Sequence, residues 1–324
     1  MKTEQYLDFE KKVADLDEQI AELTKLSSQK SIDYSWEINK IQRQLASELK
    51  RIYLNLTAWQ TVQIARHPKR PILPDYLRLI VKNFCELYGD RHFGDDPAMV
   101  TGFGEIGRYK VMIVGQNKGC GTKEKIACNF GMSNPEGHRK ALVKMKLAEK
   151  FGIPVVTLID TLGAYPGIGA EKRGQAQAIA VNLMEMSRLR VPIICVVIGE
   201  GGSGGALGIG VGDRLAILEF AYYSVISPEG CAAILWRDGS QAELAAEALK
   251  LTSKDLYKMN LIDAVIPEPL GGAHRNFNDT AYNVKKYILE SLKELKRIPI
   301  DTLLANRYQK LRSIGSNAVI NKNR

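Results

Sequence analysis

The chain lacks the features of a membrane protein, a disulfide-stapled domain or a zinc site. Its longest apolar run, residues 191–198, falls far short of the roughly 18 residues needed to span a bilayer. Its five cysteines are odd in number and include no Cys-x-x-Cys pair, which favours reduced thiols. The first residues, Met-Lys-Thr-Glu-Gln, contain no apolar segment of a secretory leader. We therefore expect a soluble, cytoplasmic protein with no metal in this chain and no membrane contact.

Acidic residues are in the minority. The 324 residues include 45 lysines and arginines against 36 acidic residues, which gives a net charge of +9. A basic balance fits an acidic substrate such as a nucleotide-bearing cofactor, an acidic partner, a nucleic acid, or merely a solvated basic surface. A nucleic-acid-binding or scaffolding role stays open, but no basic stripe interleaved with aromatic residues and no known reader motif supports it.

Hydrophobic periodicity divides the chain into three parts. Within residues 5–65, apolar residues recur at steps of four and three on both sides of a polar stretch at 27–31, which predicts an antiparallel helical hairpin. From about residue 72, strands alternate with helices, which predicts an α/β domain with parallel crossovers. The tail at 281–312 is amphipathic helix again. We expect the parts to be residues 1–71, 72–270 and 271–324.

Within the α/β part, the pattern predicts individual elements. Strands are expected near 99–105, 109–115, 154–159, 193–198, 214–218 and 222–226, and helices near 74–88, 135–151, 171–188, 229–236 and 241–249. Asn134 and Pro135 fit the start of the second helix. Gly102-Phe-Gly-Glu-Ile-Gly107 matches the dinucleotide fingerprint, but a strand follows it where the fingerprint requires a helix, so we expect a hairpin turn there.

The most informative segment is Gly199-Glu-Gly-Gly-Ser-Gly-Gly-Ala-Leu207, which directly follows an apolar run. It predicts a buried strand, a glycine-rich turn and a helix capped by Ser203. Gly204 and Gly205 have no Cβ, so a reacting oxygen can approach their N–H groups closely. The positive end of the helix dipole favours negative charge at the same place. We expect these two amides to form an oxyanion hole.

Two other enzyme classes are alternative interpretations of this segment. Gly201-Gly-Ser-Gly-Gly205 also satisfies the G-x-S-x-G nucleophile elbow, for which His274 and an acid such as Asp263 are the available partners. A hydratase or isomerase instead requires an acid near the oxyanion hole, and Glu200 and Glu229 are the local candidates.

Two more loops adjoin strand or helix ends. Residues 160–167 leave a predicted strand, and residues 128–134 lead into a predicted helix. Because sites gather at the carboxyl ends of parallel strands, both loops are candidates to converge on residues 201–205. Nearby basic residues either meet phosphates or form ordinary basic helix surface; they are Lys123, Lys125, Arg139 and Lys140.

Long strings of the sequence resemble one protein family. They include Ala65-Arg-His-Pro68, Asn129-Phe-Gly-Met132, Pro135-Glu-Gly137, Gly163-Ala-Tyr-Pro-Gly167, Val197-Ile-Gly-Glu-Gly-Gly-Ser-Gly-Gly-Ala-Leu207, Tyr223-Ser-Val-Ile-Ser-Pro-Glu-Gly-Cys231 and Ile262-Asp-x-x-Ile-Pro-Glu-Pro-Leu-Gly-Gly-Ala-His-Arg275. Together they resemble the carboxyltransferase α subunits of bacterial acetyl-CoA carboxylase, over nearly the whole chain.

The resemblance implies an α/β, crotonase-like (ClpP/crotonase) fold of repeated ββα units, here with the N-terminal helical hairpin and a C-terminal helical tail. It implies transfer of a carboxyl group from biotin on the biotin carboxyl carrier protein to acetyl-CoA, which gives malonyl-CoA for fatty-acid synthesis. It also implies a β subunit with a zinc ribbon, an α2β2 complex with each active site between α and β, and biotin carboxylase as a further component.

The resemblance assigns Gly204 and Gly205 to the ureido oxygen of carboxybiotin and an equivalent pair in β to the thioester oxygen. Fold analogy adds Gly131 and Met132 as complementary amide contacts. The remaining substrate-binding residues implied by the matching loops are Gly163, Ala164, Tyr165, Gly202 and Ser203. The sequence departs from the family pattern at three positions, namely Leu162 in place of a proline, and Cys120 and Cys128 in place of polar or basic residues.

Overall fold

The computed structural model describes residues 6–30 and 32–315. Residues 1–5, which we analysed for a leader, Ser31 in the polar stretch and residues 316–324 of the tail lie outside the described residues.

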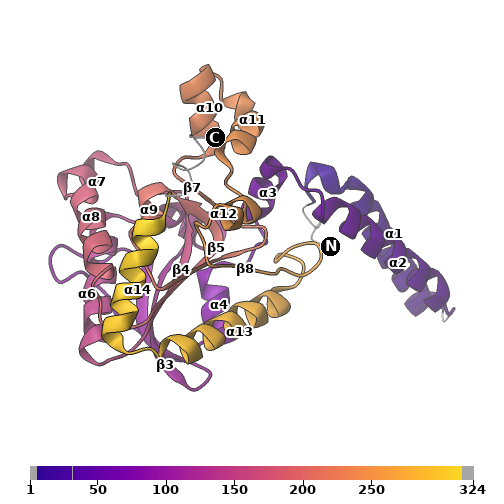
Figure 1. Cartoon of the computed structure of the whole chain (residues 1–324). Coiled ribbons are helices and arrows are strands. Elements are labelled where there is room, and N and C mark those ends of the chain that lie inside the picture. The colour runs from indigo at the N-terminus through magenta and orange to yellow at the C-terminus, as the bar shows by residue number, and fades with distance from the viewer. Residues whose placement is uncertain (1–5, 31, 316–324) are drawn as a thin grey trace, which may run out of the picture.

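One mixed sheet forms the centre of the protein (Figure 1). Its strands are β1 (Lys82–Glu86), β2 (Met99–Ile106), β3 (Tyr109–Gln116), β4 (Val155–Thr161), β5 (Ile193–Gly202), β6 (Arg214–Leu218), β7 (Tyr222–Ser224) and β8 (Ala264–Ile266). The order is β1-β2-β3-β4-β5-β6-β8, and β7 pairs with the end of β5. The first three strands are antiparallel, and from β3 onward neighbouring strands are parallel. The carboxyl ends of β3, β4 and β5 therefore share one edge.

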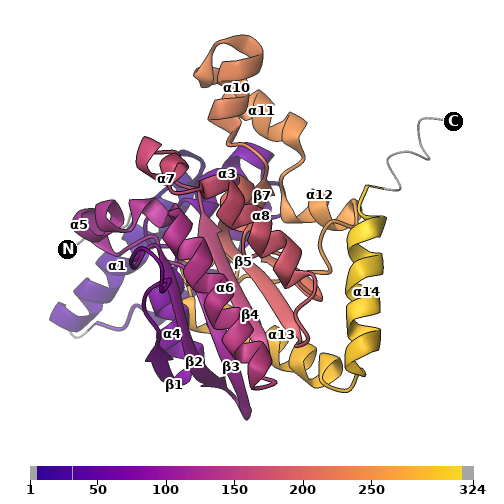
Figure 2. The same ribbon diagram turned by 90° about the vertical axis from the view of Figure 1, so that its left-hand side faces the viewer.

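Helices cover both faces of the sheet. On one face lie α6 (Pro135–Lys150) and α8 (Gln175–Met186), in front of the strands in Figure 2, whereas α4 (Leu73–Ile80) and α13 (Phe277–Leu295) lie on the other. The last helix, α14 (Ile300–Ser313), is fixed by buried Arg307. Its guanidinium pairs with Asp213 and donates to three backbone carbonyls near the start of β5.

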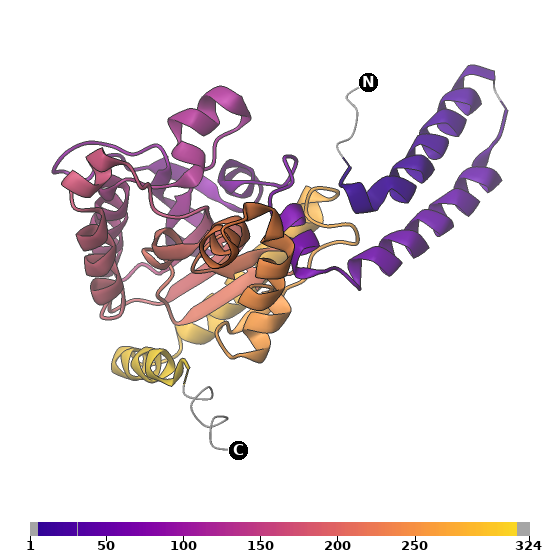
Figure 3. The ribbon, with the colours of Figure 1, turned by 90° about the horizontal axis from the view of Figure 1, so that it is seen from above.

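The predicted N-terminal hairpin is confirmed. Helices α1 (Lys11–Lys30) and α2 (Ser35–Tyr53) pack on each other and extend away from the sheet (Figure 3). The hairpin contacts the body at its base, where Val13, Leu49 and Tyr53 pack with Phe220. The apolar seam is thus covered mainly by the partner helix, and α3 (Ala58–Ala65) follows as the link to the α/β part.

Short helices complete the edge at the strand ends. They are α5 (Gly121–Ala127), α7 (Ile168–Lys172), α9 (Ser203–Leu207), α10 (Pro228–Trp236), α11 (Ala242–Leu249) and α12 (Ser253–Lys258). Helices α10 and α11 project above the sheet in Figure 1, and several of their apolar side chains face solvent, including Ile234, Leu235 and Leu244.

Four predicted boundaries were wrong. The helix at 74–88 ends at Ile80, because residues 82–86 pair with β2 as a strand. The helix at 171–188 is divided at Gly174, which has φ 82°. The tail helix is interrupted before Pro299. The strand at 193–198 continues to Gly202, because β7 pairs with the glycine segment. The predicted hairpin is confirmed, since β2 and β3 pair antiparallel, but residues 102–106 belong to β2 and the turn lies at residues 107–108.

Candidate functional site

The glycine segment joins β5 to the short helix α9. Strand β5 is buried along its whole length and ends at Gly202. Ser203 then has φ 48°, a left-handed conformation that is unusual for a residue other than glycine. The N–H groups of Ser203, Gly204 and Gly205 belong to the first turn of the helix, where no carbonyl within the helix accepts from them.

Ser203 does not cap this helix as predicted. Gly202 occupies the N-cap position, and no side chain caps the helix. The Ser203 hydroxyl makes no hydrogen bond to any residue in 6–30 or 32–315. Asn134 likewise occupies the N-cap position of α6 without capping it; its side-chain oxygen accepts instead from Arg173.

The three glycines of the turn have different surroundings. A Cβ at Gly202 would collide with the carbonyl of Leu162, and one at Gly205 would collide with the backbone of Gly163. A Cβ at Gly204 would meet only Ile179, at 3.5 Å. Gly202 and Gly205 are therefore required by close backbone packing, whereas Gly204 faces open space.

The two loops predicted to converge do so. Ser133 and Ala164 form a β-bridge, and the Tyr165 N–H donates to the Ser133 carbonyl at 3.1 Å. Gly131 approaches the end of β4 so closely that a Cβ there would lie 2.7 Å from the Asp160 carbonyl oxygen. The predicted loops and the glycine turn thus form one site.

The amides of Gly131 and Met132 already have partners in this structure. The Gly131 N–H donates to the Cys128 carbonyl at 2.8 Å, and the Met132 N–H donates to the Asn129 carbonyl at 3.0 Å. Asn129, Phe130 and Gly131 all have positive φ, so the turn is wound tightly to make these bonds. To make the expected contacts with a substrate, each of these N–H groups therefore has to break its present hydrogen bond or share it with the substrate.

A cavity of about 1260 Å³ opens beside the turn. Of the predicted site residues, those lining it are Met132, Gly163, Ala164, Tyr165, Ser203 and Gly204. Gly131, Gly202 and Gly205 are buried behind its wall. Further lining residues come from the segment that leads into α10, namely Val225, Ile226 and Ser227, and from the first turn of α10, namely Glu229.

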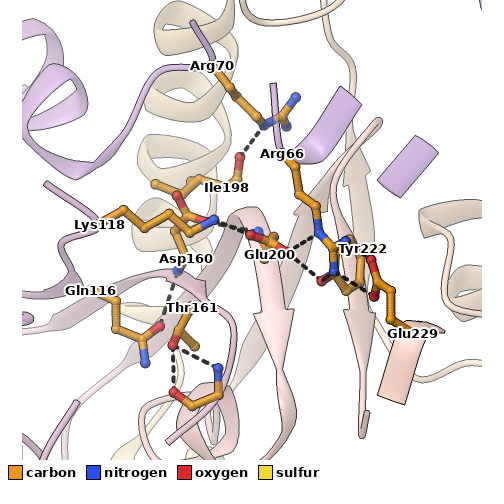
Figure 4. Close-up of polar contacts among 11 residues, drawn as sticks. Arg66, Arg70, Gln116, Lys118, Asp160, Thr161, Ile198, Glu200, Tyr222 and Glu229 are labelled. Atoms are coloured by element: carbon orange, nitrogen blue, oxygen red, sulfur yellow. Dashed lines mark hydrogen bonds and ion pairs between the residues drawn. The ribbon is translucent and has the colours of Figure 1, made fainter. Parts of the chain in front are cut away.

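An ionic network lies beneath the turn and links the strand ends (Figure 4). Lys118, just after β3, pairs with Asp160 of β4 at 2.7 Å and with Glu200 of β5 at 2.6 Å. On the other side of Glu200, Arg66 Nε donates at 2.7 Å and the Tyr222 hydroxyl at 2.6 Å. Burial alone would raise the pKa of Glu200, but Lys118, Arg66 and Tyr222 outweigh it and lower the pKa to about 2.

Sequence reasoning did not assign a role to Lys118, Arg66 or Tyr222. Arg66 appeared only within the resembling string at residues 65–68, and Lys118 in no motif at all. The rule that polar residues after parallel strands meet at one edge, which we applied to residues 160–167, identifies Lys118 as well, because it follows β3.

The network argues against Glu200 as a free general acid. A carboxyl group with a pKa near 2 is ionised at neutral pH, and three donors hold it. Glu229 is held as well, since its carboxylate pairs with Arg66.

The hydrolase triad is not assembled. The His274 ring stacks on His67, with ring centroids 3.9 Å apart, and burial lowers the pKa of His274 to about 3. Asp263 instead accepts from the Leu215 N–H and pairs with Lys310. Ser203 therefore has no base among the described residues.

The four basic residues considered as phosphate contacts lie in different environments. Arg139 pairs with Asp90 at 2.8 Å, and buried Lys140 pairs with Asp95 at 2.6 Å, so both brace the loop before β2. Lys125 lines a second cavity of about 470 Å³, together with Cys120 and Leu162, whereas Lys123 lies outside both cavities. Cys128 is buried, with its thiol near the Pro97 carbonyl.

No group of three or more His, Cys, Asp or Glu residues that could hold a metal ion is found among residues 6–30 and 32–315. A search of the same residues finds no helix long and apolar enough to cross a membrane.

Solved structures at low sequence identity show the fold class of this chain. A transcarboxylase 12S structure matches with a TM-score of 0.59 at 20% identity, covering 75% of this chain and 45% of that chain. The Pseudomonas aeruginosa geranyl-CoA carboxylase β subunit matches with a TM-score of 0.55 at 17% identity, covering 76% and 46%. A Pseudomonas malonate decarboxylase hetero-tetramer in complex with coenzyme A gives 0.56 at 17% identity, covering 72% and 94%. The predicted crotonase-like α/β fold class is confirmed.

Relatives in sequence show the family to which the chain belongs. A family model described as acetyl co-enzyme A carboxylase carboxyltransferase-like matches residues 6–315. The acetyl-coenzyme A carboxylase carboxyl transferase subunit alpha of Rhodopirellula baltica is 54% identical over 313 residues, covering 95% of this chain and 97% of that protein. Its counterpart from Xanthomonas axonopodis pv. citri is 54% identical over 311 residues, covering 96% and 98%. The chain belongs to the acetyl-CoA carboxylase carboxyltransferase family, as the resemblance predicted.

Proposed function

We propose that this chain is the α subunit of the carboxyltransferase component of acetyl-CoA carboxylase. In this role it transfers the carboxyl group of carboxybiotin, held on a carrier protein, to acetyl-CoA and so gives malonyl-CoA for fatty-acid synthesis. The observation that carries the proposal is the first turn of α9, where Ser203 and Gly204 line a cavity of about 1260 Å³ and Gly205 lies buried directly behind them. Membership of the family supplies the reaction.

The residues present fit biotin. Gly204 faces the cavity without a close neighbour, so a ring system can approach its N–H group. Gln116 Nε2 donates to the Gly205 carbonyl at 2.8 Å, which helps to fix the peptide that follows the two amides. When bound, biotin supplies the carboxyl group from its ureido nitrogen.

In this proposal the N–H groups of Gly204 and Gly205 stabilise the negative charge that develops on the ureido oxygen as the carboxyl group leaves. The loop at residues 162–164 packs against Gly205 and keeps its amide in place. Glu200 stays ionised and paired, so it does not act as a free acid beside the turn, and in this proposal proton removal from the acetyl group is left to the substrates.

The proposed partners follow from the family. They are a β subunit with a zinc ribbon that supplies the second oxyanion hole, in an α2β2 complex, together with the biotin carboxyl carrier protein and biotin carboxylase in the cytoplasm. Exposed apolar side chains near the cavity support a partner there, for example Ile168 and Val225, which are 73% and 74% exposed. In the same scheme residues 72–270 form the carboxyltransferase domain, flanked by the hairpin and the tail.

Purification of the chain alone and with the β subunit tests this function. Carboxyl transfer from malonyl-CoA to free biotin is measured for each preparation, with an enoyl-CoA as a second substrate. We expect no transfer by the isolated chain and full transfer once β is added. Full turnover by the chain alone, or hydration of the enoyl-CoA without β, would contradict the proposal.

A further inference from the structure

Arg66 is the only lysine or arginine that lines the larger cavity within residues 6–30 and 32–315. It follows α3 directly, and its side chain is 26% exposed. Its Nε atom faces Glu200, whereas Nη1 donates to Glu229 at 2.5 Å and Nη2 lies 3.4 Å from the other oxygen of Glu229. The fork of the guanidinium is thus filled by a carboxylate (Figure 4).

The two carboxylates on Arg66 have different environments. The Glu200 side chain is 4% exposed and is also held by Lys118 and Tyr222. The Glu229 side chain is 42% exposed, comes from the first turn of α10, and among the described residues pairs with Arg66 alone. Glu229 is therefore the partner that can leave at the lower cost.

The charges of the network make such an exchange favourable. Without Glu229, the network contains two cations, Lys118 and Arg66, and two anions, Asp160 and Glu200. A carboxylate at the fork shares Nη2 with the Tyr222 hydroxyl, which accepts from it at 3.2 Å, and this holds for Glu229 and for any carboxylate that replaces it. The exchange leaves no buried charge unpaired, because the displaced Glu229 side chain is 42% exposed and is solvated by water, and a buried unpaired charge is what makes breaking such a pair costly.

We propose that the Nη edge of Arg66 binds the carboxylate that is transferred, and that Glu229 occupies this edge until the substrate carboxylate displaces it. The inference rests on the proposed function, because that reaction places a carboxylate in this cavity. Arg66 is then a substrate-binding residue, and Glu229 is an internal competitor that selects for carboxylated substrates over uncarboxylated ones.

The complex with the β subunit allows a direct test, because in the reverse reaction only one substrate carries the transferred group. Transfer from malonyl-CoA to the methyl ester of biotin is measured with the unaltered chain, Glu229→Gln, Arg66→Lys and the control Glu185→Gln. Glu185 pairs with Lys146 and lies outside both cavities. Thermal unfolding verifies that each variant is folded.

Because glutamine competes poorly for a guanidinium, we expect Glu229→Gln to lower the KM for malonyl-CoA at least threefold. Arg66→Lys should raise it at least tenfold, since an ammonium cannot form the bidentate contact. Glu185→Gln should change it less than twofold, and the KM for the biotin ester should stay within twofold in all three variants.

An unchanged or raised KM for malonyl-CoA in Glu229→Gln would overturn the inference and leave Glu229 as a brace for α10. Equal changes in KM for both substrates, or equal effects of Glu229→Gln and Glu185→Gln, would overturn it too. In each of these cases the proposed function stands, because the unaltered complex is active. An inactive unaltered complex would overturn the proposed function and the inference together.

Discussion

The two walls of the larger cavity are built in different ways. The inner wall consists of the loop that follows β4 and the first turn of α9. Behind it, backbone packs on backbone and no room remains for a Cβ at Gly202 or Gly205. The outer wall consists of the segment leading into α10, where Val225 is 74% exposed and Arg66 holds Glu229 by one ion pair.

This difference indicates which parts of the site the chain can complete by itself. Buried parallel strands and close backbone contacts fix the inner wall, because interiors pack densely and resist small displacements. The outer wall has few such constraints, and an ion pair with a half-exposed partner contributes little to stability. We infer that the inner wall is preformed, whereas the outer wall adapts to the substrate and to a partner subunit.

The largest expected effect comes from disturbing the inner wall. Gly205→Val forces a side chain into the backbone of Gly163 and displaces the amide. We expect turnover of the complex to fall about 10²- to 10³-fold, the usual range for one lost oxyanion donor, with a lower melting temperature because of overpacking.

Gly204→Ala is the matched control, because its Cβ meets only Ile179, at 3.5 Å. It should leave the melting temperature unchanged and reduce turnover by less than tenfold. Steady-state kinetics and thermal unfolding measure both quantities. If Gly205→Val changed turnover and melting temperature as little as Gly204→Ala, the inner wall would not be rigid and would not differ from the outer wall.

The ionic network beneath the turn gives the next largest effect. The pKa of Glu200 falls from 4.5 to about 2 on folding, so between these pH values the unfolded chain binds more protons than the folded one. The network therefore stabilises the fold above about pH 4.5, and this contribution is lost as the pH falls toward 2. At neutral pH it amounts to about 3 kcal/mol of unfolding free energy.

Denaturant unfolding at pH 7 and at pH 3 tests this prediction. Glu200→Gln should have a lower free energy of unfolding than the unaltered chain at pH 7, and this difference in free energy should be smaller at pH 3. Glu185 on α8 pairs with the half-exposed Lys146 on α6. Glu185→Gln should show no measurable difference in the free energy of unfolding at either pH. A difference for Glu200→Gln that is independent of pH would mean that the carboxylate is not stabilised by its charge.

The inner wall was largely predictable from sequence and the outer wall was not. Glycines after an apolar run predicted the strand and the turn, where the close backbone contacts at Gly202 and Gly205 require residues without a Cβ. The role of the amides as an oxyanion hole stays a prediction. The partners of Arg66 could not be predicted, since they lie 134 and 163 residues away along the chain and meet only after the sheet has formed. Strand β1 was missed for a similar reason, as pairing with β2 overrides its weak and mostly exposed pattern.

The smallest expected effect concerns Ser203, where the sequence suggested a helix cap or a nucleophile. Its hydroxyl caps nothing and has no base among the described residues, and alanine keeps the same left-handed backbone. Ser203→Ala should therefore change the unfolding free energy by less than about 0.5 kcal/mol and turnover by less than twofold. Ser227→Ala is the matched control, because the Ser227 hydroxyl accepts from the Gly230 N–H at 3.1 Å and does cap α10; its loss should cost about 1 kcal/mol. If Ser203→Ala abolished activity in a complex that still assembles, Ser203 would be the nucleophile, and the inner wall would not act through an oxyanion hole alone.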